Sequence, residues 1–311
     1  MNQDKLNIKE ALNEQGGFHV WWRLLRPHTL TASFVPVFVG TMFAFIENNT
    51  FHTALFVAMM LAAILIQAAT NMFNEYYDFK RGLDKEDSVG IGGTIVRDGV
   101  SPQKILTLAF LFFGIAILLG VYIAASTSWW IAAIGACCMF IGYLYTGGPL
   151  PIAYTPFGEL FAGLLMGTVM IAISYYIQTM MVTIGVILIS LPIAIFIGAI
   201  LLSNNIRDLD NDKESGRKTI AILLGRKKAI QFLVLLFAIA YGLTCALIIN
   251  GILPLWSIIT LLSIKVAVDV IKGFIGKKTP IEMMPAMAAT GKTNSVYGFL
   301  LGLSLLIGHF F

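Results

Sequence analysis

The sequence has little charge. Only 12% of its 311 residues are Asp, Glu, Lys or Arg, whereas 58% are hydrophobic, and its mean hydropathy is +0.82. A soluble domain carries roughly 25% charged residues and could not bury this much apolar surface. The composition therefore excludes a soluble globular protein and predicts an all-α membrane protein.

Cysteine and histidine are also scarce. The three cysteines, Cys137, Cys138 and Cys245, lie inside apolar runs, so the sequence holds neither a disulfide framework nor zinc-ligand spacing. The four histidines are scattered along the chain, which argues against a histidine metal site. The residues before Gly17 are polar, so no cleavable signal peptide is expected.

Long apolar runs predict nine transmembrane helices, since one helix needs roughly 20 such residues to cross a bilayer. The predicted helices cover residues 30–47, 54–75, 104–124, 129–146, 158–178, 182–203, 229–249, 253–272 and 294–311. With the N-terminus inside, every Lys and Arg except Lys265 falls in or beside a cytoplasmic segment. The positive-inside rule therefore places the N-terminus and the loops after the second, sixth and eighth helices in the cytoplasm. The expected location is the plasma membrane.

The N-terminal stretch HVWWRLLRP (residues 19–27) mixes aromatic residues with arginines. This composition is typical of a helix that lies at the headgroup level of the membrane. We therefore expect an interfacial segment over residues 1–29 and a single transmembrane domain over residues 30–311. Two cytoplasmic loops of that domain, residues 74–103 and 204–228, hold the candidate motifs.

The end of the predicted second helix carries carboxamides and a carboxylate at steps of four, three and four: Gln67, Asn71, Asn74 and Asp78. Residues at this spacing share one helix face. A polar stripe in a membrane helix is expected to face the bundle interior, because contact with lipid is costly. Asp84 lies off this face on a straight helix, and Gly82 offers a turn that could bring it back.

A similar spacing recurs after the predicted sixth helix, where Asn204, Asp208 and Asp212 stand four residues apart. Both groups lie on the same side of the membrane, which suggests a shared cavity. Oxygen ligands without His or Cys favour Mg²⁺ or Ca²⁺ over Zn²⁺, and Mg²⁺ commonly completes its shell with substrate phosphates. Basic residues interleave with these acids: Lys80, Arg81, Arg97, Arg207, Arg217 and Lys218. This mixture suits a diphosphate held by both metal and cations.

Two stretches, NEYYDFKRGLD (residues 74–84) and NNIRDLDNDKESGRKT (residues 204–219), resemble the aspartate-rich motifs of the UbiA superfamily of intramembrane aromatic prenyltransferases. The resemblance covers nearly the whole chain. It implies a helical bundle around a central cavity, with both motifs in cytoplasmic cap loops. It also implies that two Mg²⁺ ions are held, with Asn204 in support, by Asn74, Asp78, Asp84, Asp208 and Asp212. The four aspartates of this set are the expected catalytic residues.

Within the family, the stretch YTGGPLPIAYTPFGE (residues 145–159) and the longer first motif are similar to the members that prenylate 1,4-dihydroxy-2-naphthoate. This implies transfer of a polyprenyl group from polyprenyl diphosphate in the lipid bilayer, with loss of CO₂ and formation of demethylmenaquinone. No nucleic-acid partner is expected. Residues 145–159 lack the lysine of some relatives, so the expected diphosphate-binding cations are Arg26, Arg97 and Lys218. The aromatic residues expected near the allylic cation are Tyr143, Tyr145, Tyr154, Phe157 and Tyr175.

Two alternatives remain open at this stage. One is a prenyltransferase of the same type with another acceptor, such as 4-hydroxybenzoate or homogentisate. The other is a cation transporter with acidic cytoplasmic gates. Transporters place ionisable groups near the bilayer midplane, whereas the acids here lie at helix exits and only Lys265 and Asp269 are deep in an apolar run.

Overall fold

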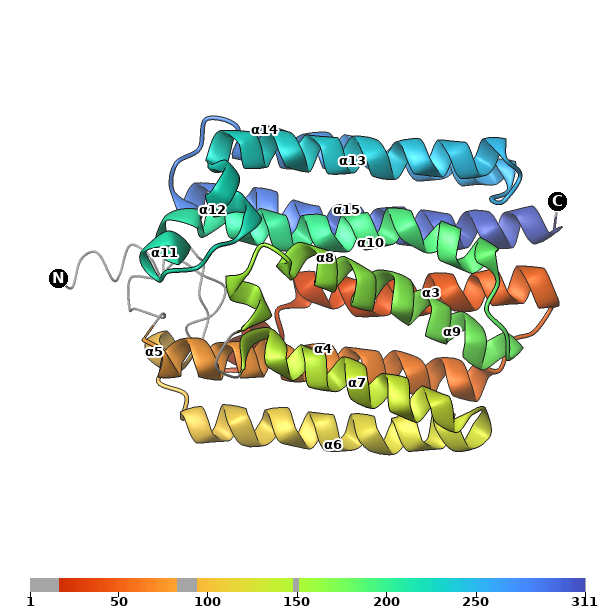
Figure 1. Cartoon of the computed structure of the whole chain (residues 1–311), viewed down its shortest axis with the longest axis horizontal. Coiled ribbons are helices and arrows are strands. Elements are labelled where there is room, and N and C mark those ends of the chain that lie inside the picture. The colour runs from red at the N-terminus through yellow and green to blue at the C-terminus, as the bar shows by residue number, and fades with distance from the viewer. Residues whose placement is uncertain (1–16, 83–93, 148–150, 311) are drawn as a thin grey trace.

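The computed structural model describes residues 17–82, 94–147 and 151–310, and over these residues it is helical, with no β-strand. Long helices lie side by side along the longest dimension of the molecule (Figure 1). The continuous ones are α3 (Pro27–Asn48), α4 (Thr53–Lys80), α6 (Pro102–Ser126), α7 (Trp129–Thr146), α10 (Ile184–Arg207), α13 (Arg226–Ile249) and α15 (Pro280–Phe310). Helices suit these apolar sequences, because lipid offers no partner to an unpaired backbone group.

Two further lengths of helix are composite. One joins α8 (Gly158–Ala162), the π-helix η2 (Gly163–Val169) and α9 (Met170–Thr179), and the other joins the 3₁₀-helix η3 (Leu255–Ser263) to α14 (Ile264–Phe274). Five short helices occupy the polar end of the bundle or the turns near it: α2 (Phe18–Leu25), α5 (Thr94–Asp98), η1 (Ile152–Tyr154), α11 (Leu209–Glu214) and α12 (Ile220–Leu224).

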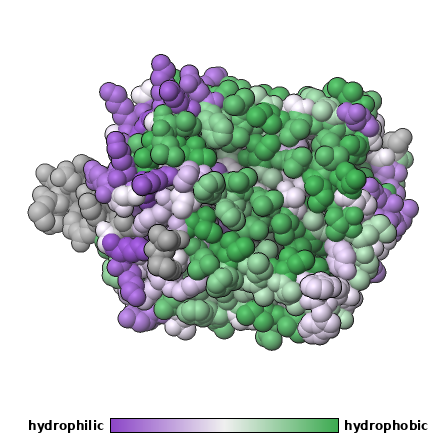
Figure 2. Space-filling view, viewed as in Figure 1, coloured by the Kyte–Doolittle hydropathy of each residue, from purple (hydrophilic) through white to green (hydrophobic). Residues whose placement is uncertain are grey.

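Seven helical segments of the described chain are long and apolar enough to cross a membrane, so the predicted nine spans are confirmed for seven. Of the other two, α7 is shorter, and the η3–α14 segment changes helix type at Ser263. Large apolar side chains such as Leu118, Ile184 and Ile249 are exposed. The visible face carries a hydrophobic band, and hydrophilic residues gather at its ends (Figure 2). This is the surface of a multi-pass membrane protein.

The last helix begins well before the predicted residue 294, at Pro280. The sequence prediction was wrong here because polar residues interrupt the apolar pattern. The neighbouring helix α3 satisfies them: the Asn294 side-chain amide donates to Thr31 Oγ1 at 2.9 Å. Buried Asn and Thr side chains thus join α15 to α3 instead of ending α15.

Both polar motifs lie at one end of the bundle, the left end of Figure 1, where α4 ends at Lys80 and α10 ends at Arg207. The expected turn after α4 is confirmed, because Gly82 has φ +70° and its N–H donates to Phe79 O at 3.0 Å. Asp84, which that turn should redirect, lies outside the described residues. At the second motif, Asp212 N–H donates to Asp208 O at 2.9 Å and Asp208 N–H donates to Asn204 O at 3.0 Å. The predicted polar ridge therefore stays helical across the junction of α10 and α11.

Candidate active site

A cavity of about 470 Å³ lies inside the bundle, between α3, α4, α6, α7, the α8–η2–α9 segment and α10. Along α4 it extends from Met59 to Asn74, which is ~22 Å at 1.5 Å per residue. Most of its lining is apolar, and the polar side chains gather toward the end that carries the motifs: Arg26, Gln67, Asn71, Asn74, Tyr145 and Asn204. The cavity is therefore a largely apolar chamber whose polar side chains concentrate at its mouth.

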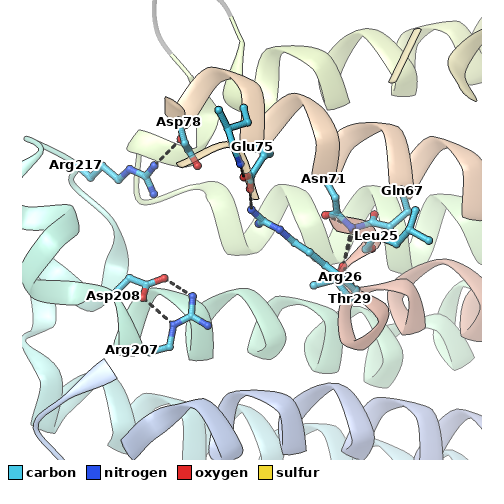
Figure 3. Close-up of polar contacts among 11 residues, drawn as sticks. Leu25, Arg26, Thr29, Gln67, Asn71, Glu75, Asp78, Arg207, Asp208 and Arg217 are labelled. Carbon is cyan, nitrogen blue, oxygen red and sulfur yellow. Dashed lines mark hydrogen bonds and ion pairs between the residues drawn. The ribbon is translucent and has the colours of Figure 1, made fainter. Parts of the chain in front are cut away.

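The predicted polar face of α4 does point into the bundle. Asn71 is buried, and its side-chain amide donates to Leu25 O at 2.8 Å and to Thr29 Oγ1 at 3.0 Å. Both acceptors belong to the chain around Arg26, which connects α2 to α3 with φ +52° (Figure 3). Asn71 thereby fixes the turn that carries Arg26 to the cavity.

The two motifs meet through one guanidinium group. Arg217 donates to Asp78 Oδ1 at 3.2 Å and lies 3.0 Å from Asp212 Oδ1. Asp78 is at the end of α4 and Asp212 is on α11, so these two ion pairs join segments far apart in the sequence. Figure 3 shows the contact between Arg217 and Asp78. Asp208 takes a different partner, since its carboxylate accepts two hydrogen bonds from the buried Arg207, one of them from Nε at 2.7 Å.

The carboxylates and the free carboxamide oxygen around Asp212 fit a bound metal cation in addition to Arg217. Burial raises the pKa of Asp212 to about 7; Arg217 opposes this rise, and the carboxylates of Asp208 and Asp78 add to it. In addition, Asn204 lines the cavity and its buried Oδ1 has no hydrogen-bond partner. A carboxamide oxygen without a donor, close to a carboxylate cluster, is the ligand type that Mg²⁺ accepts.

No three acidic, imidazole or thiol side chains within the described ranges are close enough together to hold a metal ion by themselves. Asp84, the remaining predicted ligand, is outside those ranges. The described donor set, Asn74, Asp78, Asn204, Asp208 and Asp212, is rich in oxygen but spread over two motif segments. This donor chemistry fits Mg²⁺, which commonly binds through one or two carboxylates and completes its shell with water and substrate phosphates.

Partly buried ion pairs join the short helices α2 and α5 to the end of α4. Glu75 is 1% exposed; its Oε1 accepts from Ile95 N–H at 3.2 Å and its Oε2 lies 3.7 Å from Arg26 Nη2. Arg23 donates to both oxygens of Asp98, at 3.0 and 3.1 Å. These contacts attach α2 and α5 to α4. A buried carboxylate without partners would be strongly destabilising, so Glu75 is best explained by this assembly.

The predicted diphosphate-binding cations are placed differently from one another. Arg26 lines the cavity, and Arg97 is half-buried on α5. Lys218 is exposed, and its backbone N–H donates to Tyr154 O at 2.8 Å. Arg217, which the sequence places among the cations near the acids but not among the expected diphosphate ligands, contacts carboxylates of both motifs. Its position within the second motif, residues 204–219, already indicated a cation beside the acids.

Among the predicted aromatic residues, Tyr145 lines the cavity and the others do not. Tyr143 is hydrogen-bonded to Tyr77, and Phe157 is exposed. Tyr175 is buried and donates to Glu47 at the far end of α3. Tyr154 stacks with arginines instead. Spacing along a helix could not separate these roles, because each depends on which neighbouring helix the ring meets.

A helical membrane bundle with an apolar chamber, whose polar end lies next to a carboxylate cluster joined by an arginine, defines an intramembrane transferase of the UbiA fold. The solved UbiA homologue from Archaeoglobus fulgidus, described as bound to GPP and Mg²⁺, superposes with a TM-score of 0.65 at 17% identity, covering 93% of this chain and 99% of that one. The chain belongs to the UbiA prenyltransferase family, whose sequence profile matches residues 33–280.

Among named relatives, the 1,4-dihydroxy-2-naphthoate octaprenyltransferase of Bacillus subtilis is 56% identical over 311 residues and covers the full length of both chains. The enzyme of the same name from Mycobacterium tuberculosis is 28% identical over 296 residues, which are 94% of this chain and 98% of that one.

Proposed function

We propose that this protein transfers a polyprenyl group from polyprenyl diphosphate to 1,4-dihydroxy-2-naphthoate, with loss of CO₂ and in dependence on Mg²⁺. The observation that carries the proposal is the meeting of Asp78, Arg217 and Asp212 one helical turn beyond Asn74, which lines the polar end of an apolar cavity. The full-length similarity to the Bacillus subtilis octaprenyltransferase supports the choice of acceptor.

The metal site of this proposal draws on both motifs. Asn74, Asp78, Asp84, Asp208 and Asp212 would hold two Mg²⁺ ions, and the unpartnered Asn204 oxygen would support them. When bound, Mg²⁺ neutralises the charge that develops on the departing diphosphate.

The protein's own residues then have separable tasks. Arg217 and Arg26 hold the diphosphate and stabilise its growing negative charge by hydrogen bonds that are already oriented. The apolar chamber accommodates the prenyl chain and excludes water, which would otherwise capture the allylic cation. Tyr145 places an aromatic ring in the cavity wall where a cation–π contact is available. The allylic carbon–oxygen bond breaks as diphosphate departs, and the carboxyl-bearing ring carbon bonds to the allylic carbon. The carboxylate on that ring carbon then leaves as CO₂, and its bonding electron pair returns to the ring.

The purified protein should form prenylated product from 1,4-dihydroxy-2-naphthoate and a polyprenyl diphosphate, with release of CO₂. Removal of divalent metal with EDTA should abolish the reaction, and added Mg²⁺ should restore it, because the motif carboxylates repel a diphosphate that carries no metal. Product analysis and CO₂ capture measure both effects. Product from 4-hydroxybenzoate or homogentisate alone would refute the proposed acceptor, and full activity in EDTA would refute the metal dependence.

The proposed topology has nine crossings, with the motif end in the cytoplasm of a cell-membrane protein. The η3–α14 segment supports this number: nine 3₁₀ residues at ~2.0 Å and eleven α residues at ~1.5 Å span ~34 Å, enough for the hydrocarbon core. The excess of Lys and Arg at the motif end supports the orientation.

Cysteine labelling tests this orientation. In a background with Ser at all three native cysteines, Asn250→Cys should react with a membrane-impermeant maleimide in intact cells, because residue 250 lies in the exposed turn at the far end of α13. Ser215→Cys, exposed just after α11, should react only after lysis. The opposite pattern would invert the topology.

A further inference from the structure

The loop between α7 and α8 brings one aromatic ring into the motif cluster. Tyr154 is the last residue of η1, and its ring lies 4.9 Å from the guanidinium carbon of Arg217 and 5.5 Å from that of Arg81, measured to the ring centroid. Arg81 directly follows α4, and Arg217 follows α11. One side chain from a third segment therefore contacts an arginine from each motif.

The backbone around this ring is held in place. Tyr154 O accepts from Lys218 N–H at 2.8 Å, and Thr155 Oγ1 donates to Ile152 O at 2.7 Å. The first of these bonds attaches η1 to the residue next to Arg217, so the backbone keeps the two segments together where the ring meets the guanidinium. Arg81 also stacks on Tyr77, 5.6 Å from that ring, and so has an aromatic neighbour on its own segment.

The loop itself supplies no positive charge, since residues 145–159 contain neither Lys nor Arg. The charge near it comes from Arg81 and Arg217, whose long side chains would lose conformational entropy on binding an anion. A flat ring against a guanidinium restrains its orientation beforehand, and the attraction between cation and π-face adds to the restraint. The Arg217 Nε, moreover, is buried without a hydrogen-bond partner. A donor is thus available beside the two carboxylates.

We propose that Tyr154 is a positioning residue that orients Arg81 and Arg217 toward the diphosphate of the prenyl donor. The inference rests on the proposed function, because it assigns the diphosphate to the site of Asp78 and Asp212. Tyr154 itself does not touch the reacting atoms. The loop has no cation of its own, so the positive charge comes from Arg81 and Arg217. Tyr154 holds these two side chains in orientation by stacking on them.

Pyrophosphate with Mg²⁺ serves as the probe, and its binding to the purified full-length protein is measured by calorimetry. Tyr154→Leu should weaken this binding about tenfold, the loss expected when cation–π contacts with two arginines disappear. Tyr154→Phe keeps the ring and should stay within about threefold of the parent protein. Tyr122→Leu is the matched control: this tyrosine is on α6, is 46% exposed, and should bind as the parent does.

Steady-state kinetics separate positioning from a loss of structure. Tyr154→Leu should raise KM for the prenyl diphosphate about tenfold and leave KM for the aromatic acceptor unchanged, whereas a damaged fold would lower kcat with both donors and acceptors. If Tyr154→Leu does not fold, Tyr154→Met, which fills the space without a π-face, gives the same comparison.

Binding of Mg²⁺–pyrophosphate to Tyr154→Leu or Tyr154→Met within twofold of the parent would overturn the inference. Equal weakening by Tyr154→Phe would overturn it too, since the hydroxyl and not the ring would then be responsible. If the parent protein bound Mg²⁺–pyrophosphate in a Tyr154-dependent manner but did not prenylate a naphthoate, only the proposed acceptor would fail. No binding by the parent protein would refute both the diphosphate site and the role of Tyr154.

Discussion

Replacement of Asp78 by Asn should reduce prenyl transfer by a factor of about 10³ while the protein still folds. Asp78 is the carboxylate of the first motif that meets Arg217 of the second, so its charge serves both the metal and the arrangement of the two motifs. Loss of one oriented electrostatic group at a reacting centre typically costs ~2.7–4 kcal/mol of transition-state stabilisation. The rate of product formation at saturating Mg²⁺ measures the effect.

Asp210→Asn is the control for this substitution. Asp210 belongs to α11, like Asp212, but its side chain is 74% exposed and pairs with Arg226 at 2.7 Å. An exposed ion pair contributes ~0–1 kcal/mol, so we expect this variant to retain activity within about twofold. Activity of Asp78→Asn near that of Asp210→Asn would contradict the proposed metal and diphosphate site.

Replacement of Gly135 by Phe should abolish the use of long prenyl donors and spare short ones. Gly135 lines the cavity on α7, ~15 Å along the helix from Tyr145 at the mouth, and a Cβ added there meets no atom within 4 Å. The added ring therefore enters the chamber without disturbing the backbone. The two isoprene units of geranyl diphosphate extend only ~9 Å, at about 1.1 Å per main-chain bond, and end before this point. An octaprenyl chain has to pass it.

The measurement compares turnover with octaprenyl and geranyl diphosphates. We expect more than a tenfold loss for the octaprenyl donor and less than threefold for the geranyl donor. Gly114→Phe is the matched control, because this glycine lies on the exposed face of α6, where an added Cβ also meets nothing. Equal use of both donors by Gly135→Phe would show that the prenyl chain does not follow this cavity.

Some of the site could be predicted from spacing alone. The steps between Asn71, Asn74 and Asp78 indicated a common inward face, and the structure has Asn71 buried against the α2–α3 turn and Asn74 in the cavity wall. Likewise, i to i+4 hydrogen bonds keep Asp208 and Asp212 on the ridge that begins at Asn204. These predictions succeeded because helical geometry is local.

Other parts of the site depend on contacts between distant segments. Arg217 was one of several cations near the acids in sequence, and only the folded chain brings it to both Asp78 and Asp212. Glu75 lies inside the first motif, and only the folded chain shows that it contacts Ile95 and Arg26. The early start of α15 escaped prediction for the same reason, since Thr31 of α3 satisfies Asn294.

The sequence by itself determined the membrane class, the helical architecture and the end of the bundle at which the charged residues gather. These features follow from composition and from the periodicity of single helices. Tertiary structure decided which cation meets which carboxylate, which ring faces the cavity and which stacks on arginine. The physical reason is that charge pairing and stacking act over only a few ångströms. Their partners are therefore chosen by the packing of α4, α10 and the α7–α8 loop at one end of the bundle.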